Sequence, residues 1–417
     1  MKKFTLILGV GVLMLLSSCD NGVEVLQPIV DPSGVLATTD PVPNKSKPWM
    51  EGIYTVESGS SVFGKQVVLK WSNDNLSIFT SKNAGYAVLK GGEIDSVFYF
   101  EGYWRFRTST ETGVLSLQIS KSEGGAILTA KDSTGGEIVL RGSFGNGTQP
   151  GNAEVILRFL RPFSDFVKQN KFYILAHRGG GRNSDYLGVS ENTLQIIKQS
   201  EGYGANGIEI DVKLSSDGIP FIYHDDDINL RTTQKGVLWG NIEQFTWNLI
   251  SAFVTLKNGE KIPSLIEALD YIIEETSLSF IWLDLKSSRN EIPIVTEIVL
   301  EMLKKGYVKK RDLQIVIGLP SEDKLNNLVK VKDFTTIPTL CELDINSVRK
   351  ANSKYWAPRW TLGTQTPIVL ELQNEGRGAF VWTIDDPAFI ESFITEGKFN
   401  GMLTNYPSLV AYYHYTR

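Results

Sequence analysis

Cysteine and histidine are scarce in this chain of 417 residues, which contains two of the first and three of the second. Positive charge is not in excess either, because 42 lysines and arginines stand against 47 aspartates and glutamates. A net charge of −5 argues against a nucleic acid as the main partner, since proteins that bind one carry basic surfaces. The composition, with 42% hydrophobic and 21% charged residues, is typical of a globular protein. The length predicts a small domain and a barrel of roughly 250 residues.

The N-terminal apolar run, residues 4–16, is shorter than the about 20 residues that a transmembrane helix needs. Two lysines precede this run, and small residues lead from it to Cys19, so the segment resembles a bacterial lipoprotein signal. The resemblance implies a signal peptide over residues 1–18, a lipid on Cys19, and a membrane anchor in the bacterial cell envelope, facing the periplasm or at the cell surface. A plain secretory leader is the alternative. Cys341 would then be the only remaining thiol, which excludes an intrachain disulfide.

Composition changes along the chain divide it further. Residues 19–48 are rich in Pro, Asp, Asn, Ser and Thr and lack periodicity, which predicts a tether. Residues 49–145 contain short segments of alternating polarity between glycine-rich turns, which predicts a small all-β domain, a barrel or a sandwich, without catalytic residues. Glycine and proline then predict a linker and barrel entry over residues 146–170. From residue 171 to 417, apolar strands alternate with helical stretches, the pattern of a parallel sheet.

The C-terminal domain offers more strands than a (β/α)8 TIM barrel has places for. We expect an α/β fold of this kind, with a doubly wound open sheet as the alternative from the pattern alone. One candidate has to be dropped, and we expect it to be either 337–343 or 355–359. The candidate strands are residues 172–176, 207–214, 220–224, 279–285, 313–317, 337–343, 355–359, 378–384 and 401–404.

Polar side chains accumulate at the carboxyl ends of the first four candidates, which is where a (β/α)8 barrel builds its active site. Alternation along a strand places Glu209 and Asp211 on one face, and Asp284 and Lys286 likewise. Each pair is therefore expected to point into the same mouth. In chain order these polar residues are His177, Arg178, Glu209, Asp211, His224, Asp225, Asp284 and Lys286.

Three of these residues, Glu209, Asp211 and Asp284, are carboxylates with no extra histidine or cysteine ligand nearby. Such a set of hard oxygen ligands favours one divalent cation, Mg²⁺ or Ca²⁺, over Zn²⁺. Without a cation, like charges this close would raise each other's pKa and cost stability. With one, phosphate oxygens would be neutralised and an ester aligned for attack. A glycosidase pair fits less well, because carboxylates on one strand do not flank a scissile bond.

Two of the three histidines, His177 and His224, follow strands and have charged neighbours. The unperturbed pKa of histidine, about 6.5, suits it for acid and base catalysis at neutral pH. We therefore expect these two to be catalytic. His414 lies in an aromatic tail and is expected to be structural.

Seven short motifs in this order resemble those of the glycerophosphodiester phosphodiesterase family, over about residues 171–410. The resemblance implies a (β/α)8 fold and hydrolysis of small glycerophosphodiesters to glycerol 3-phosphate and an alcohol. The substrate's own glycerol hydroxyl would attack phosphorus, and water would open the cyclic phosphate. The motifs are His177-Arg178-Gly179, Glu191-Asn192-Thr193, Glu209-Ile210-Asp211, His224-Asp225 with Arg231-Thr232-Thr233, Asp284-Leu285-Lys286, Trp382-Thr383 and Thr404-Asn405-Tyr406-Pro407.

The resemblance also implies roles for single residues. Glu209 and Asp211 match the metal ligands of the family, while His177 and His224 match its acid–base pair. We expect His177 to be the base and His224 the acid of the first step. The remaining matches concern the substrate: Arg178 and Lys286 as cations that hold the phosphate, Glu191 as a glutamate near metal and substrate, and Trp382 as an apolar wall of the site.

Some features depart from the family pattern. Asp284 stands where glutamate is usual, which is similar to a sphingomyelinase D-like branch, and Asn405 stands where aspartate is common. The loop 180–190 is longer than usual, and its Arg182 is either a phosphate or headgroup contact or part of a solvated loop. The alternatives are a phospholipase acting on intact lipids, sphingomyelinase D-like or phosphatidylinositol phospholipase C-like, and a non-catalytic surface binding protein.

Overall fold

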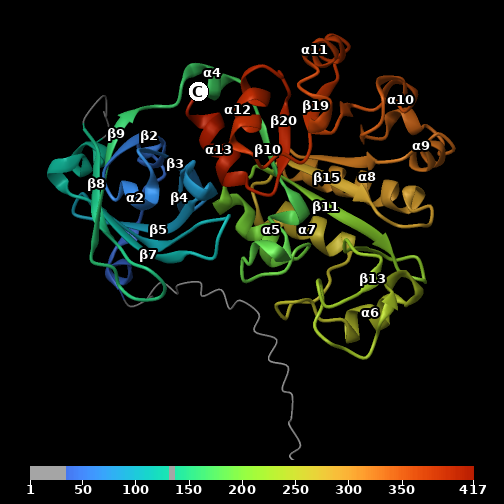
Figure 1. The fold of residues 1–417 in the computed structure, drawn as a ribbon, viewed down its shortest axis with the longest axis horizontal. Helices are drawn as coiled ribbons and strands as arrows, with labels where there is room; N and C mark the ends of the chain where they lie inside the picture. The colour runs from blue at the N-terminus through green and yellow to red at the C-terminus, as the bar shows by residue number, and fades with distance from the viewer. Residues whose placement is uncertain (1–33, 131–136) are drawn as a thin grey trace, which may run out of the picture.

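A computed structural model describes residues 34–130 and 137–417 and consists of two barrels side by side (Figure 1). The predicted signal peptide, Cys19 and the first part of the predicted tether lie outside the described residues. Within them, no helix combines the length and the apolar character that crossing a membrane requires. The predicted fold class, a (β/α)8 barrel preceded by a small β-domain, is confirmed.

The N-terminal unit is a closed antiparallel barrel, so the open choice between barrel and sandwich is resolved. Each strand pairs with its neighbour in sequence, and the last pairs with the first. Closure leaves no free sheet edge. The strands are β2 (Gly52–Ser58), β3 (Gln66–Ser72), β4 (Asn75–Phe79), β5 (Tyr86–Ile94), β6 (Val97–Arg105), β7 (Thr112–Ile119), β8 (Val139–Phe144) and β9 (Ala153–Arg161), with the short β1 (Asp40–Pro41) added to β5.

Large apolar side chains fill this first barrel. Trp71, Phe98 and Phe100 are among its buried residues, and Phe63 packs edge-to-face on Phe144 at a centroid distance of 5.3 Å. The barrel interior is therefore a packed core, and no cluster of metal-ligating side chains occurs among its described residues.

Two domain boundaries differ from the prediction. Strand β9 lies within the predicted linker 146–170, because the Gly- and Pro-rich run before it is the turn between β8 and β9. The linker prediction is wrong for residues 153–161, which complete the hydrogen-bonded ladder by pairing with β2. The end of the predicted tether is also ordered, since it contains β1 and the start of α1 (Lys47–Met50).

The C-terminal unit is a barrel of parallel strands. The first strand pairs with both the second and the last, which closes the barrel. Its strands are β10 (Tyr173–Ala176), β11 (Gly207–Leu214), β15 (Phe280–Leu285), β16 (Gln314–Leu319), β17 (Thr339–Cys341), β18 (Tyr355–Trp356), β19 (Gly378–Val381) and β20 (Gly401–Thr404). The longer helices around it are α5 (Leu194–Ser200), α7 (Leu265–Glu275), α8 (Ile292–Val308), α9 (Glu322–Leu328), α11 (Thr366–Asn374), α12 (Pro387–Thr395) and α13 (Pro407–Tyr415).

The surplus strand is not one of the two expected. Residues 337–343 and 355–359 both contain barrel strands, β17 and β18. Instead β12 (Pro220–Ile222) runs antiparallel to β11, with Val212 opposite Ile222. The connection over residues 215–219 is too short for a parallel crossover, which needs about a dozen residues, so it makes a hairpin. His224 therefore reaches the mouth from a hairpin and not from a third barrel strand.

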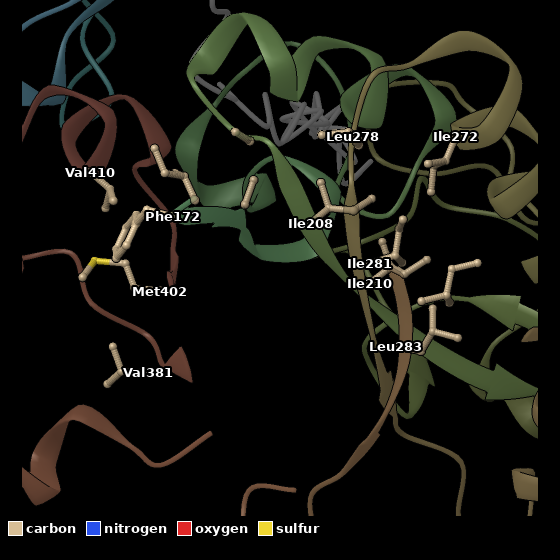
Figure 2. Close-up of a cluster of buried hydrophobic side chains, with 14 of the residues drawn as sticks. Phe172, Ile208, Ile210, Ile272, Leu278, Ile281, Leu283, Val381, Met402 and Val410 are labelled. Carbon is tan, nitrogen blue, oxygen red and sulfur yellow. The ribbon is translucent and has the colours of Figure 1, made fainter. Parts of the chain in front are cut away.

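The core between strands and helices explains the direction of the polar side chains. Ile208 and Ile210 of β11 lie in the cluster that packs on the surrounding helices, together with Ile272 of α7 (Figure 2). Since side chains alternate along a strand, Glu209 and Asp211 between and beyond these isoleucines point into the barrel. Ser264 starts α7 with a reciprocal capping box, and this helix packs beside β12.

Candidate active site

A cavity of about 570 Å³ lies at the carboxyl ends of the barrel strands. Most of the predicted site residues line it, and Asp211 lies just beneath, 1% exposed. Other lining residues were not anticipated, chiefly Glu342, Leu343, Arg359 and Leu362. The predicted residues in the wall are His177, Arg178, Glu209, His224, Asp284, Lys286 and Trp382.

Three carboxylates meet at the floor of the cavity. Asp211 and Asp284 are register partners on the adjacent strands β11 and β15, and Glu209 lies two residues before Asp211. One oxygen of each lies within 4.8 Å of the others. Burial, followed by the charges of Asp211 and Asp284, raises the pKa of Glu209 well above its usual range. A cation between the three would remove this cost.

Each carboxylate has one oxygen held by a protein donor. The backbone N–H of Arg178 donates to Glu209 Oε2 at 2.9 Å, the Asn192 amide donates to Asp211 Oδ2 at 2.7 Å, and Lys286 Nζ lies 2.5 Å from Asp284 Oδ2. The second oxygen of each carboxylate is buried and has no hydrogen-bond partner among the described residues. These three free oxygens fit a hard divalent cation, and the donors behind them fix their orientation.

The orientation of His177 is set by Asn405, which follows β20. Asp385 accepts hydrogen bonds from the Asn405 backbone N–H and side-chain amide, so Asn405 Oδ1 faces His177 Nδ1 at 2.7 Å. Nδ1 therefore carries the proton and Nε2 keeps its lone pair, 3.7 Å from Glu209 Oε2. Burial and then the Arg178 charge lower the pKa of His177. A neutral imidazole with a free Nε2 is suited to accept a proton.

His224 has the opposite environment. Its Nδ1 lies 2.7 Å from Asp225 Oδ1. Burial raises the pKa of Asp225, but hydrogen bonds from Arg231, Asn229 and His224 outweigh burial and hold that pKa well below its usual range. The Asp225 carboxylate accepts from Nδ1–H of His224 and fixes the orientation of the ring, so Nε2 is available for proton transfer.

Glu191 and Arg182, which the sequence suggested as substrate contacts, do not line the cavity. Glu191 is buried and does not line the cavity; its carboxylate accepts from Arg178 at 2.7 Å, from Arg231 at 2.9 Å and from the Asn183 backbone at 2.9 Å. Glu191 therefore holds the Arg178 guanidinium from behind through an ion pair, and the Arg231 and Asn183 donors hold Glu191 in place. Arg182 donates to Asp185 at 2.8 Å and is likewise absent from the cavity wall.

Trp382 forms part of the cavity wall near two residues that sequence reasoning missed. Its indole N–H donates to Ala357 O at 2.8 Å, and the Arg359 guanidinium lies 4.7 Å from its ring centroid. Glu342 follows β17, and its Oε1 has no hydrogen-bond partner among the described residues. Burial and then the Asp284 charge raise the pKa of Glu342 to about 8. Retaining both 337–343 and 355–359 as strands would have placed Glu342 and Arg359 at the mouth.

Comparison with known proteins gives the same assignment as the motifs. A model of the glycerophosphoryl diester phosphodiesterase family matches residues 177–409. The chain belongs to this family. It is 25% identical over 246 residues to a glycerophosphodiester phosphodiesterase of Caldanaerobacter subterraneus subsp. tengcongensis, covering 57% of this chain and 95% of that protein. The family model begins at His177, so the N-terminal barrel lies outside the part of the chain that it matches.

Other members are more distant or match over less of their length. Glycerophosphodiester phosphodiesterase 1 of Homo sapiens is 32% identical over 145 residues, which covers 34% of this chain and 40% of that protein. A solved glycerophosphodiester phosphodiesterase from Parabacteroides distasonis is 20% identical, with a TM-score of 0.48, and covers 60% of this chain and 99% of its own.

Proposed function

We propose that the chain hydrolyses glycerophosphodiesters to glycerol 3-phosphate and an alcohol, using one divalent cation with His177 and His224 as the acid–base pair. Membership of the family and the names of its relatives support the substrate class. One observation carries the mechanism: three carboxylate oxygens without hydrogen-bond partners converge at the floor of a cavity whose wall contains two histidines with different hydrogen-bonding environments.

Glu209, Asp211 and Asp284 would hold the cation, Mg²⁺ or Ca²⁺, through their free oxygens. When bound, the cation neutralises charge on the phosphate and orients it. Arg178 and Lys286 line the same cavity and would bind the remaining phosphate oxygens through charged donors.

The two histidines then divide the proton transfers. Nε2 of His177 accepts the proton of the substrate's glycerol hydroxyl as that oxygen attacks phosphorus, and Nε2–H of His224 protonates the departing alcohol. In the second half, His224 accepts a proton from water as water attacks the cyclic phosphate, and His177 returns its proton to the glycerol oxygen. Each histidine ends in its starting state.

Hydrolysis of intact phospholipids is a second candidate function, favoured by one observation. Leu362 lines the cavity and is 58% exposed, so an apolar side chain stands at the rim where an acyl chain would pass. A phospholipase of the sphingomyelinase D-like or phosphatidylinositol phospholipase C-like kind would use such a lip.

A substrate panel separates these functions. The chain is incubated with glycerophosphocholine, glycerophosphoethanolamine, glycerophosphoglycerol and the corresponding phospholipids, each with Mg²⁺, Ca²⁺ or chelator. Glycerol 3-phosphate is measured for the small diesters, and the released headgroup alcohol or phosphorylated headgroup is measured for the lipids. We expect release from the small diesters that requires a cation and is lost in His177→Ala. Turnover that is indifferent to chelation would contradict the mechanism, and turnover of the lipids alone would favour the phospholipase.

We also propose that Cys19 carries the lipid that anchors the chain to the bacterial cell envelope, facing the periplasm or at the cell surface. The support is the signal-like sequence before it. Metabolic labelling with a radioactive fatty acid is expected to mark the wild-type chain and not Cys19→Ala. Equal labelling of the two would contradict the anchor.

A further inference from the structure

The N-terminal barrel contacts the catalytic loops through a buried arginine. Arg107 lies two residues beyond β6, and its side chain is 0% exposed. Its Nη2 donates to Asn405 O at 2.5 Å and to Gly180 O at 3.1 Å. Asp185 Oδ2 lies 3.7 Å from the same nitrogen, and the Tyr203 ring centroid lies 5.2 Å from the guanidinium carbon.

Both oxygens that accept from Arg107 belong to loops that bear on His177. Gly180 directly follows the turn that contains His177, and Asn405 is the residue whose amide orients the imidazole. The two loops follow β10 and β20, the strands at which the barrel closes. One guanidinium from the other domain therefore ties together the two loops that determine where His177 Nε2 points.

A second arginine extends the contact toward His224. Arg105, also buried, donates to Tyr186 O at 2.6 Å, on the same long loop as Gly180. Asn183 of this loop exchanges hydrogen bonds with Glu191. Glu191 accepts from Arg231, and Arg231 also binds Asp225, the partner of His224.

The chemistry of Arg107 favours positioning over simple stabilisation. Its Nε and Nη1 have no hydrogen-bond partner among the described residues. A buried cation with so few partners adds little net stability, and a well-packed apolar side chain would often serve as well. An apolar side chain would lack the Nη2 group, which donates to both Gly180 O and Asn405 O and so sets the distance between the two loops.

Building on the function proposed above, we propose that the N-terminal barrel acts as a positioning domain, with Arg107 as the positioning residue that holds His177 in its catalytic orientation. Arg107 does not line the catalytic cavity. It acts through Asn405 and Gly180, and misplacing a catalytic group by about 1 Å costs on the order of 100-fold in rate.

The test compares Arg107→Met with Arg107→Lys in the full chain. Methionine replaces the aliphatic part of the arginine side chain and lacks the donors, while lysine keeps the charge and part of the donation. Arg161→Met is the matched control, because Arg161 also crosses the domain boundary, donating to Thr416 O at 2.6 Å just beyond the far end of α13. We expect kcat to fall about 10- to 100-fold in Arg107→Met with KM within about twofold, partial recovery in Arg107→Lys, and wild-type kcat in Arg161→Met.

A readout independent of activity uses the three histidines of the chain. Nitrogen-15 NMR of the histidine-labelled protein reports the tautomer of each ring. In the wild type we expect one His177 tautomer, protonated at Nδ1, and in Arg107→Met a mixture of tautomers, with His414 unchanged.

The outcomes separate the two proposals. An inactive wild type would defeat the proposed function, while the tautomer of His177 would still test the positioning role. Wild-type kcat and a single His177 tautomer in folded Arg107→Met would overturn that role. Equal losses of kcat and thermal stability in Arg107→Met and Arg161→Met would also overturn it. If Arg107→Met does not fold, the Arg107→Lys and Arg161→Lys pair decides by the same criteria.

Discussion

The two barrels of this protein close in different ways, and the difference determines which of them holds a site. In the N-terminal barrel each strand returns antiparallel to the one before, so turns lie at both ends and large apolar side chains fill the interior. In the C-terminal barrel all strands run parallel, so the carboxyl ends of all strands share one rim. Polar residues that follow different strands meet at that rim, which is why parallel barrels gather catalytic groups.

The largest effect is expected from a change at the mouth of the C-terminal barrel, where the proposed catalytic groups lie. His177→Ala removes the proposed base, and we expect kcat to fall about 100- to 10,000-fold, the range for loss of acid–base catalysis. Glycerol 3-phosphate release under saturating substrate measures it. His414→Phe is the matched control, since His414 is buried and stacks on Phe172 at 4.9 Å away from the cavity. An equal loss of kcat in both variants would contradict the assignment of catalysis to the mouth of the C-terminal barrel.

The complementary change is made in the apolar core of the N-terminal barrel. Phe98 is fully buried in the N-terminal core, and Phe98→Ala is expected to lower the free energy of unfolding by about 3–5 kcal/mol through lost burial and a cavity. Chemical denaturation measures the loss. At a temperature where the variant stays folded, kcat is expected to match the wild type. A strong fall in kcat without unfolding would mean that packing in this core also controls the mouth.

Acid is expected to weaken the two barrels unequally, because all three histidines lie in the C-terminal one. Burial, followed by the Arg417 charge, lowers the pKa of His414 to about 4. The unfolded chain binds this proton at about pH 6.5, so the contribution is present above pH 6.5 and is lost as the pH falls to 4, by about 3 kcal/mol. The free energy of unfolding at pH 7 and pH 4 is therefore expected to differ less in His414→Phe than in the wild type. Identical differences would contradict this.

The smallest effect concerns cation binding. Mg²⁺ or Ca²⁺ at about 100 times its dissociation constant is expected to stabilise the folded chain by about 2.7 kcal/mol. For a domain of this size that is a rise in melting temperature of roughly 5–10 °C. Differential scanning calorimetry with cation and with chelator measures the shift. Asp284→Asn is expected to abolish it, and Asp312→Asn, an exposed carboxylate paired with Lys171, is expected to retain it. A shift that survives in Asp284→Asn would place the cation elsewhere.

Much of the site was predictable because its spacing is local. Glu209 and Asp211 are two residues apart on a strand, and the isoleucines beside them pack against the helices, so their direction follows from strand alternation. The position of His224 at the mouth was predicted, yet for the wrong reason, because the strand before it is a hairpin partner of β11. Glu342 was missed since its strand, β17, is short and its segment was a candidate for removal.

By itself the sequence determined the type of barrel, the order of the motifs and the chemical character of the mouth, because these depend on periodicity and residue type within short stretches. Only the tertiary structure decided that β9 closes the first barrel, that Glu191 supports Arg178 from behind, and that Arg107 reaches Asn405 across 298 residues. Such pairings join segments far apart in the chain. Their geometry depends on how whole domains pack, and no local spacing in the sequence records it.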